Sequence, residues 1–336
     1  MRYERDKYKF IIAGTGGGLY DYVYHDANDL AYVTYDTGLV LKPFCKALMK
    51  LHLSSRVNRI FPMPFRAVWG KLWVRQWAKK LGKMNLEDRN PCFILFADVI
   101  PFERFGLTKM IRKTFPRAKI VYFYQDLVAR DPNKLYLIQK KTADCIFSFD
   151  CGDAETYHLY EHNFPYSKWR EHFYCGTPEY EVCFVGKAKD RLPQILEAYD
   201  YFTTQGLRCC FYVTGVPETE KQFADRIFYC DEMPYETYLD KISKAKCILE
   251  IMQGGGSGNT LRINEAVEFN KILITNNINV KKNPLYDPRY MFPYEKIDQI
   301  ECDYIREIQN VCYENREQMS IETFLEDVAK TLAANR

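Results

Sequence analysis

The sequence predicts an α/β protein built of two Rossmann-like domains. Strand-like and helix-like segments alternate along the whole chain, which is the pattern of parallel sheets flanked by helices. The length of 336 residues exceeds what one hydrophobic core usually organises, so two domains are expected. We place the first domain at 1–172, the second at 173–302 and a C-terminal helical tail at 303–336.

The predicted strands are short apolar runs that end at glycine or at polar residues. Helical periodicity separates them, most clearly at 107–115 and 132–142 in the first domain and at 192–205 and 234–244 in the second. The connection around 161–178 shows neither period. The expected strands are 8–13, 31–35, 92–97, 119–123 and 145–149 in the first domain, and 181–185, 208–214, 246–252 and 272–275 in the second.

Composition argues against an integral membrane protein and against a disulfide-stabilised secreted one. No run approaches the ~18 consecutive apolar residues of a membrane span, since the best one, 92–97, is far too short. The charged N-terminus, MRYERDKYKF, leads directly into a predicted strand and is unlike a signal peptide. The 12 cysteines form no CxxC pair and have no histidine partner at zinc spacing. We therefore expect a reduced, cytoplasmic protein without a structural metal.

The most specific local signal is the glycine-rich loop QGGGSGNT at 253–260, between a predicted strand and an amphipathic helix. Glycines let the backbone approach a ligand closely, and a helix N-terminus presents N–H groups and a positive dipole to an anion. The loop therefore suits a phosphate group. The alternative interpretation is a turn that serves only tight packing of the strand and the helix.

Two further strand ends in the second domain carry the same type of signal. Gly186 ends one predicted strand and is followed by Lys187 and Arg191, whose charges suit a diphosphate leaving group. Gly215 clears space at the end of the next strand. Because ligands of parallel sheets bind outside the carboxyl ends of the strands, these residues and the glycine loop are expected to line one crevice.

Together these stretches resemble the donor domain of the GT-B glycosyltransferases over the span 182–277. The matching segments are FVGKAKDR, YVTG, MPYETYLDKISKAKCILE and SGNTLRINEAVEFNKILITN. The resemblance implies two Rossmann-like domains facing across a cleft, with a C-terminal helix at 321–333 that crosses back to the first domain. The first domain is similar to the family in layout only.

By this resemblance the second domain binds a nucleoside diphosphate-sugar. Lys187 and Arg191 would hold the diphosphate, and Glu265 would bind the ribose. Arg262, which replaces a proline of the family pattern, is also placed to reach a phosphate. The full set of expected donor-binding residues is Gly186, Lys187, Arg191, Gly215, Gly258, Asn259, Thr260, Arg262 and Glu265.

The implied activity is transfer of a sugar to a saccharide or a polyprenyl-pyrophosphate-linked acceptor, in bacterial surface polysaccharide or lipopolysaccharide biosynthesis. Retaining members carry a second glutamate eight residues before the ribose-binding one, where this chain has Ser257, so retaining and inverting transfer both stay open. The chain has no D-x-D motif. Cationic side chains and helix N–H groups can stabilise the leaving diphosphate, so no metal or other cofactor is expected.

An inverting enzyme also needs a general base near the acceptor hydroxyl. Asp126 follows a predicted strand in the stretch VYFYQDLV, and Asp150 stands at the end of the fifth predicted strand. His25, with its neighbour Asp26, follows the first helix signal. The alternative for the carboxylates at strand ends is capping of the following helix.

The N-terminus carries a competing fingerprint. The sequence GTGGG at 14–18 follows the first strand and Asp36 ends the second, an arrangement close to the dinucleotide-binding motif, although Leu19 occupies the position of its third glycine. An NAD(P)-dependent oxidoreductase and a non-catalytic nucleotide-binding module are therefore alternatives. A nucleotide-sugar 2-epimerase, which shares the two-domain layout, is the closer rival.

The formal net charge is only +3, but the segment 37–86 contains eleven basic residues and no acidic one. Three of the four tryptophans recur there at every fourth position, on one face of a predicted helix. Tryptophan beside Lys and Arg is typical of a helix at a membrane interface, which would hold a peripheral enzyme at the inner, anionic leaflet or guide a lipid-linked acceptor. The main alternative is a core-facing stripe with a solvated basic back. Nucleic acid is not an expected partner, because no recognised module accompanies the basic residues. The expected surface residues are Trp69, Lys71, Trp73, Arg75, Trp77, Lys79 and Lys80.

Overall fold

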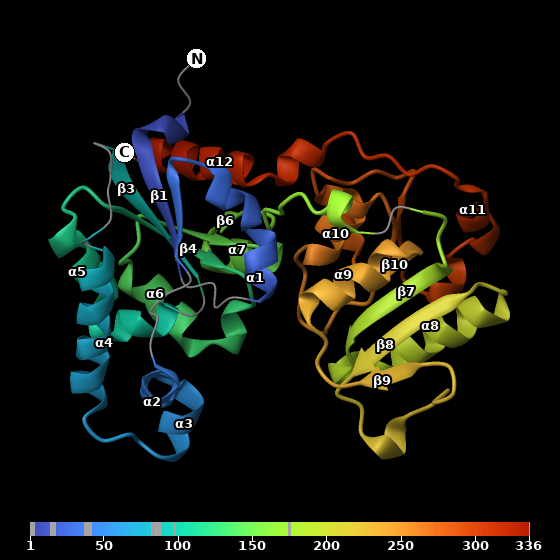
Figure 1. The fold of residues 1–336 in the computed structure, drawn as a ribbon, viewed down its shortest axis with the longest axis horizontal. Helices are drawn as coiled ribbons and strands as arrows, with labels where there is room; N and C mark the ends of the chain where they lie inside the picture. Colours follow the sequence, from blue (N-terminus) through green and yellow to red (C-terminus); the bar gives the residue numbers. More distant parts are fainter. Residues whose placement is uncertain are drawn as a thin grey trace. The chain divides into compact units, whose positions relative to one another are not determined.

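A computed structural model of the chain describes residues 4–13, 18–36, 42–81, 83, 89–96, 99–173 and 176–335. The chain divides into two compact units, each built around its own sheet (Figure 1). Unit 1 comprises residues 1–162 and 321–336, and unit 2 comprises residues 163–320. The predicted boundary at 172 therefore falls inside unit 2, and residues 303–320 of the predicted tail also belong to unit 2.

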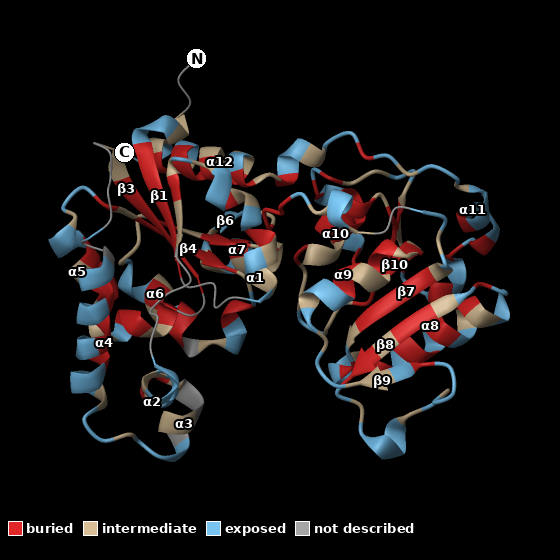
Figure 2. Ribbon diagram, in the orientation of Figure 1, coloured by how far each residue is buried: buried red, intermediate tan, exposed pale blue. Residues whose placement is uncertain are grey.

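Unit 1 contains a six-stranded sheet in the order β2-β1-β3-β4-β5-β6, with parallel pairing throughout. Its central strands form a buried layer between helices (Figure 2), which explains why they read as nearly continuous apolar runs. The strand β1 is buried at every position, including Lys9, whose Nζ donates to the carbonyl oxygen of Ala31. The strands are β1 (Tyr8–Ala13), β2 (Val33–Asp36), β3 (Asn90–Leu95), β4 (Lys119–Tyr124), β5 (Cys145–Ser148) and β6 (Tyr160–Glu161).

The helices of unit 1 include the C-terminal helix of the chain. In this helix Phe324 is fully buried, with its ring centroid 5.2 Å from that of Phe123 and 4.9 Å from that of His162. The last helix is thus part of the core of unit 1, although 158 residues of unit 2 separate it in sequence. The helices are α1 (Leu19–Val23), α2 (Pro43–Leu53), α3 (Ser55–Ile60), α4 (Arg66–Leu81), α5 (Leu107–Thr114), α6 (Pro132–Lys140), α7 (Cys151–Tyr157) and α12 (Ile321–Ala334).

Helix α4 corrects the expectation for the tryptophan stripe. Trp73 and Trp77 are only 4% and 2% exposed and belong to the core of unit 1, so they are not membrane-facing residues. Trp69 is 36% exposed, and its ring stacks on that of Trp73 at 6.1 Å and on that of His52 at 5.3 Å. The core-facing alternative is therefore correct for two of the three tryptophans. The basic residues of α4 are exposed, as expected for the solvent-facing side of a helix whose other side packs into the core: Lys71, Arg75, Lys79 and Lys80.

Unit 2 contains a second six-stranded parallel sheet, in the order β12-β11-β10-β7-β8-β9. A separate hydrophobic core, which includes Val182, Phe211, Leu249 and Ile274, packs against it. The strands are β7 (Tyr180–Lys187), β8 (Cys209–Thr214), β9 (Phe228–Cys230), β10 (Ala245–Glu250), β11 (Ile272–Thr275) and β12 (Met291–Pro293). The helices are α8 (Leu192–Thr204), α9 (Tyr235–Ser243), α10 (Leu261–Phe269) and α11 (Cys302–Glu307).

Each of the nine predicted strands is present, with bounds that differ from the expected ones by at most two residues. The edge strands β6, β9 and β12 were not predicted, because two or three residues are too few to show an alternating pattern. The glycines 14–17 of the competing fingerprint lie outside the described residues. Among the residues that are described, no helix is long and apolar enough to cross a membrane.

Candidate functional site

The order of the strands marks a candidate site in unit 2. From β7 the chain moves to its neighbour β8, and it later returns to the other side of β7 with β10. The winding of the sheet therefore reverses between β7 and β10. Open α/β sheets bind ligands at such a switch point, outside the carboxyl ends of the strands.

Arg191 lies at this switch point and joins its two strands. Its Nε and Nη2 donate to the carbonyl oxygen of Lys187 at 3.2 and 3.1 Å, and its Nη1 donates to the carbonyl oxygen of Ile251, just after β10. A side chain at Gly186 would place its Cβ 3.1 Å from Nη2 of Arg191, so the glycine makes room for the guanidinium. Burial lowers the pKa of Arg191 to about 10, and the nearby positive charge of Arg262 acts in the same direction.

Arg262 is the second cation at the switch point. Its Nη2 donates to the carbonyl oxygen of Val185 in β7 at 2.7 Å, and its guanidinium lies 4.4 Å from the ring centroid of Tyr238. Burial opposes its charge, but Glu265 and Tyr238 more than compensate and raise the pKa of Arg262. The two guanidinium groups thus lie near the carboxyl ends of β7 and β10, and the contact of Arg262 with a phosphate stays a prediction.

Glu265 lies in the interior of unit 2. It is fully buried, and its Oε2 accepts a hydrogen bond from Nη1 of Arg262 at 2.7 Å. The hydroxyl of Tyr235 donates to Oε1 at 2.7 Å, and that of Tyr238 donates to Oε2. Both carboxylate oxygens are thus engaged inside the protein. In this arrangement Glu265 holds Arg262 in place, and its direct contact with a ribose stays a prediction.

Three tyrosines line the buried side of this ion pair. The hydroxyl of Tyr166 lies 2.8 Å from that of Tyr235, which extends the hydrogen-bonded chain away from Glu265. Burial, with the charge of Glu265, raises the pKa of Tyr166 and of Tyr235 well above the ordinary value. Both hydroxyls therefore stay protonated: Tyr235 donates its proton to the carboxylate, so Tyr166 is the donor toward Tyr235.

The glycine-rich loop is fastened at both ends. The backbone N–H of Gly254 donates to Oδ2 of Asp190 at 2.9 Å, which ties the loop to the turn after β7. Gly255 has a φ of 81°, a conformation that L side chains rarely adopt. At the other end the Thr260 side chain caps α10, accepting from the backbone N–H of Arg262 at 3.1 Å. The loop therefore leads into the N-terminus of α10 beside the two arginines.

The other expected donor-binding residues surround this loop. Asn259 is 6% exposed, with its Oδ1 buried and without a hydrogen-bond partner in the described structure. The carbonyl of Gly258 accepts from Nδ2 of Asn277 at 3.0 Å. Gly215 follows β8 with a φ of 74°. Lys187 is more peripheral, because its exposed Nζ forms an ion pair of 2.9 Å with Glu232.

Sequence reasoning missed Glu250 at the end of β10. Its Oε1 accepts from the hydroxyl of Thr260, and its Oε2 accepts from that of Thr275 at 2.5 Å. Burial raises the pKa of Glu250, while these two hydrogen bonds act in the opposite direction. A carboxylate that ends a buried apolar strand, with threonines later in the chain, was the signal available in the sequence.

The three candidate bases of unit 1 differ in availability. Asp126 lies just after β4 with its side chain 55% exposed, paired with Arg130 at 3.0 Å. Asp150 is 2% exposed and caps α7, accepting from the backbone N–H of Asp153 at 2.9 Å, as the capping alternative describes. His25 is exposed in a short 3₁₀ helix, with Nδ1 3.6 Å from Oδ1 of Asp26.

The turn that carries Asp126 is held by a buried lysine. Lys134 is 3% exposed, and its Nζ donates to the carbonyl oxygens of Asp126 and, at 3.3 Å, of Leu127. Burial lowers the pKa of Lys134, and the surrounding carboxylates counteract that effect. Asp126 is therefore a solvent-accessible carboxylate on a fixed backbone.

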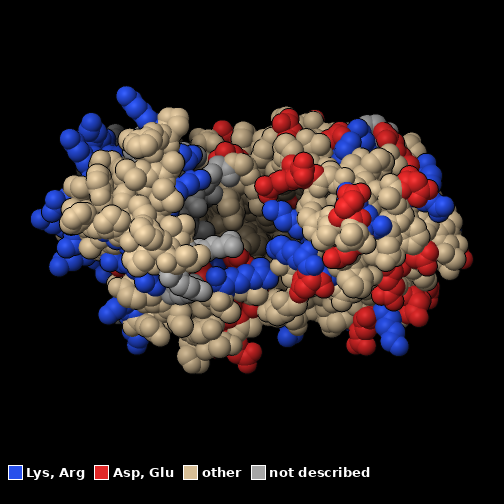
Figure 3. All heavy atoms as spheres, turned by 90° about the horizontal axis from the view of Figure 1, so that it is seen from below, with Lys and Arg blue, Asp and Glu red and all other residues tan. Residues whose placement is uncertain are grey.

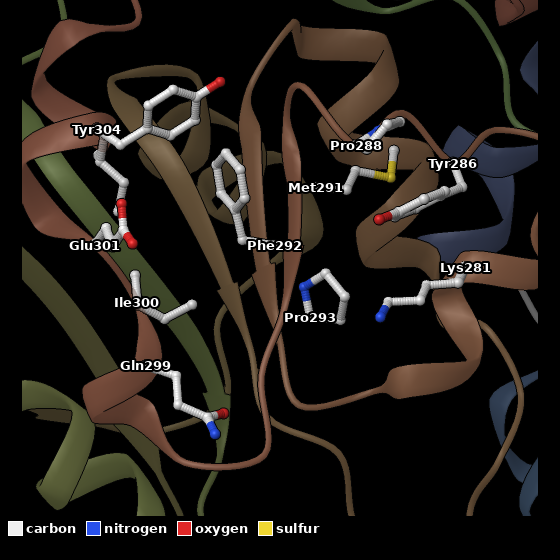
Figure 4. A pocket seen from close by; sticks show the side chains of 11 residues that line it. Lys281, Tyr286, Pro288, Met291, Phe292, Pro293, Gln299, Ile300, Glu301 and Tyr304 are labelled. Carbon is white, nitrogen blue, oxygen red and sulfur yellow. The ribbon is translucent and has the colours of Figure 1, made fainter.

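A cavity of about 320 Å³ lies elsewhere in unit 2, beside the edge strand β12 (Figure 4). Phe292 and Pro293 of β12 face it, with Tyr304 on one side and Tyr286 on the other. None of the expected donor-binding residues lines this cavity. The candidate site therefore rests on the topology and the charges rather than on cavity size. Among the described residues, no group of three or more His, Cys, Asp or Glu side chains could hold a metal ion.

Solved structures of glycosyltransferases match nearly the whole chain. A UDP-forming α,α-trehalose-phosphate synthase from Burkholderia xenovorans gives a TM-score of 0.59 at 10% identity, over 97% of this chain and 98% of that chain. An α-glucosyltransferase in complex with UDP-glucose and DNA containing an abasic site gives 0.56 at 12% identity, over 97% and 94%. A B. xenovorans trehalose-phosphate synthase in complex with glucose-6-phosphate gives 0.54 at 11% identity, over 97% and 98%.

These matching structures are GT-B glycosyltransferases, and the two parallel six-stranded sheets with their helices give this chain the same fold. The predicted α/β fold class is thereby confirmed. No protein-family model matches the chain, and no curated protein matches it in sequence. At these identities the likeness establishes the fold, so the activity must be argued from the site.

Proposed function

We propose that this protein is a glycosyltransferase that uses a nucleoside diphosphate-sugar, with UDP as the nucleotide to test first. The observation that supports it best is the pair of guanidinium groups, Arg191 and Arg262, at the switch point of unit 2. Burial lowers the pKa of Arg191 to about 10, and the repulsion from the like charge of Arg262 acts in the same direction. A diphosphate would relieve that repulsion. The matching structures with UDP or UDP-glucose in their descriptions make UDP the first choice.

In the proposed reaction, the bond between the anomeric carbon and the diphosphate oxygen breaks, and the negative charge that develops on the leaving UDP needs partners. Arg191 and Arg262 supply fixed positive charge, and the N-terminus of α10 supplies backbone N–H groups beside them. Glu265 keeps Arg262 oriented through the 2.7 Å ion pair. Such a set of groups can stabilise the leaving nucleotide without a metal ion. Independence of a metal is therefore part of the proposal.

For an inverting reaction we assign Asp126 as the general base. It would take the proton of the acceptor hydroxyl while that oxygen forms the new bond to the anomeric carbon. Asp126 is the most exposed of the candidate carboxylates, and Lys134 fixes its backbone. His25 is the second candidate, since it is also exposed. A retaining reaction would not require this base.

The acceptor in this proposal is a saccharide or a polyprenyl-pyrophosphate-linked sugar, and the process is bacterial surface polysaccharide synthesis at the inner face of the cell membrane. The resemblance of the stretch 182–277 to the donor domains of such enzymes supports this assignment. The abundance of basic residues in the segment 37–86 suits a pyrophosphate-bearing acceptor.

Calorimetric titration of UDP into the wild type and into Arg191→Ala and Arg262→Ala tests the site. We expect each substitution to weaken UDP binding by ~10- to 100-fold, the range of one to two charge-assisted hydrogen bonds. Arg208→Ala is the matched control, because Arg208 precedes β8 at the opposite end of the same sheet and pairs with Glu181. Its affinity for UDP should equal that of the wild type.

Screening GDP, dTDP, CMP and NADH in parallel separates the alternatives. Binding of NADH alone would reject the transferase in favour of an oxidoreductase. Incubation with UDP-sugars then distinguishes a transferase, which releases UDP when an acceptor is present, from a 2-epimerase, which converts the sugar without an acceptor. An unaltered affinity in both arginine variants would remove the switch point from the proposal.

A further inference from the structure

Unit 1 exposes an unusual number of large apolar side chains in one short segment. Of the thirteen large apolar residues that are exposed in the described part of the chain, eight lie between positions 44 and 72. Four of them are more than two-thirds exposed: Phe44 at 79%, Ile60 at 82%, Phe61 at 67% and Phe65 at 77%. We call the eight residues the apolar tip: Phe44, Leu51, Ile60, Phe61, Phe65, Val68, Trp69 and Leu72.

The apolar tip follows helical periodicity, so its exposure is not a scatter of single residues. In α4 the exposed apolar positions 68, 69 and 72 recur at the spacing of one helix face, and Phe65 lies directly before the helix, while the buried face uses 70, 73, 74, 77 and 78. The first half of α4 is therefore apolar on two sides, of which only one packs into the core. In α2, Phe44 and Leu51 are two turns apart on one face.

The helices that carry the apolar tip lie side by side. The Nε of Arg66 donates to the carbonyl oxygen of His52 at 2.9 Å, and the ring of Trp69 stacks on that of His52. Together α2, α3, the start of α4 and the turn between α3 and α4 form the lower end of unit 1 in Figure 1. Extended apolar surface of this kind marks an interaction site on a folded protein.

The sequence segment that carries the apolar tip has only positive charges. The segment 37–86 contains no acidic residue, and its exposed bases include Lys42, Lys46, Lys50, Lys71 and Arg75. Figure 3, seen from below Figure 1, shows Lys and Arg gathered along the left-hand edge of unit 1. In a bilayer, the apolar side chains would contact the acyl chains, and the flexible basic side chains beside them would reach the lipid phosphate groups.

We propose that the apolar tip docks unit 1 onto an anionic phospholipid bilayer, with Phe61 and Phe65 inserted among the acyl chains and the surrounding lysines on the lipid phosphates. Nucleic acid would also attract the bases, but it gives no reason for four aromatic or aliphatic side chains to remain in water. This assignment moves the contact surface from the buried Trp73 and Trp77 to the turn between α3 and α4. The proposed docking surface specifies how the protein would contact the membrane in the proposed function. Docking of this surface does not depend on transferase activity.

Flotation of the full-length protein with vesicles tests the proposal. Neutral phosphatidylcholine vesicles are compared with vesicles that also contain phosphatidylglycerol, at low and at high salt. We expect flotation only with the anionic vesicles, reduced at high salt because added ions screen the lysines. The double variant Phe61→Ser/Phe65→Ser should lower the bound fraction at least ~10-fold, because both inserted rings are lost.

Phe228→Ser is the matched control, since Phe228 is 53% exposed in unit 2 and should not alter flotation. Circular dichroism checks that each variant folds, which is expected because the substituted side chains lie in solvent. Absence of wild-type flotation at low salt, or equal flotation of the double variant, would overturn the proposal. So would binding of a DNA duplex, measured by fluorescence anisotropy, that outcompetes the vesicles. The calorimetric UDP titration is independent of all these outcomes.

Discussion

The carboxylate of Glu265 controls the position of Arg262. It is fully buried, yet the guanidinium that it binds retains some exposure, with 24% of the Arg262 side chain reachable by solvent. Tyr235 and Tyr238 also donate hydrogen bonds to this carboxylate. A buried acid with this set of partners acts on a ligand through the arginine rather than by touching the ligand itself.

Glu265→Gln should therefore weaken UDP and 2′-deoxy-UDP by the same factor, ~10-fold, because the loss comes from a displaced Arg262. In an Arg262→Ala background the same substitution should cause little further loss, since the two residues act as one unit. Isothermal titration with both nucleotides measures this. A loss seen with UDP but absent with the deoxynucleotide would show that Glu265 contacts the ribose after all.

Stability provides a second readout at this residue. Removing one partner of a buried ion pair leaves an uncompensated charge, so Glu265→Gln is expected to lower the free energy of unfolding of unit 2 by about 3 kcal/mol. The control Glu236→Gln, at the start of α9 on the exposed side, should change it by less than about 0.5 kcal/mol. Equal stability of both variants would contradict the assigned role.

The roles of single residues were only partly predictable from the sequence. The glycines and arginines of the switch point could be found because strand ends are visible as changes in the apolar pattern. The partners of Glu265 could not, because Tyr235 and Tyr238 stand on another helix, about thirty positions earlier in sequence. Asp150 likewise carried no sign in the sequence of whether it would cap a helix or face solvent.

At the scale of elements, α4 shows how one helix serves two surfaces. Gly70 lies on its buried side, where an added Cβ would come within 2.3 Å of the Phe105 ring. Glycine in the middle of a helix normally costs about 1 kcal/mol relative to alanine. Here it allows α4 to approach the segment Ile100–Phe105 closely enough to bury Trp73 and Trp77.

Gly70→Ala is therefore expected to destabilise unit 1 by about 1–3 kcal/mol, against its favourable helix propensity, because the ring must be displaced. Urea denaturation followed by tryptophan fluorescence reports the change, since Trp73 and Trp77 lie beside the site. Gln76→Ala, on the exposed side of α4, is the control and should leave the midpoint nearly unchanged. A stabilised Gly70→Ala variant would mean that the contact with Phe105 is not tight.

The sequence of α4 also explains why its orientation was not predicted. Apolar residues at 68, 69, 72, 73, 74, 77 and 78 cover more than one helix face, so periodicity alone cannot select the side that packs inward. The inward-facing side of α4 is determined by tertiary packing, because only one side of this helix contacts the core that includes residues of β3 and η3 (Ile100–Phe105). The other apolar side of α4 stays exposed and forms part of the apolar tip.

At the scale of the whole molecule, unit 1 contains both the first and the last residues of the chain, and unit 2 lies between them in sequence. Strand pairing in unit 2 involves only residues 180–293, whereas unit 1 needs both ends of the chain. The alternation of strands and helices was enough to predict both sheets. The return of α12 followed only from the family resemblance, because a helix of ordinary amphipathic pattern does not indicate which core it joins.

Truncation after Ser320 distinguishes the stability of unit 1 from that of unit 2. It removes six buried side chains, which at ~1.5–3 kcal/mol for each large one amounts to about 10 kcal/mol, comparable to the entire stability of a typical domain. We therefore expect unit 1 to unfold while unit 2, with its own core, keeps its thermal transition and binds UDP within about threefold of the wild type. The side chains removed are Ile321, Phe324, Leu325, Val328, Ala329 and Leu332.

Calorimetric melting with and without UDP measures both effects on one sample, because only the transition of unit 2 should shift with the nucleotide. Deletion of residues 335–336 alone is the control: it removes the 2.7 Å hydrogen bond between the hydroxyl of Tyr160 and Asn335 but leaves α12 in place. Both transitions should then stay within a few degrees of the wild type. If the longer truncation abolished UDP binding while unit 2 still melted cooperatively, the donor site would not reside in unit 2 alone, and the role assigned to Arg191 and Arg262 would have to include residues of unit 1.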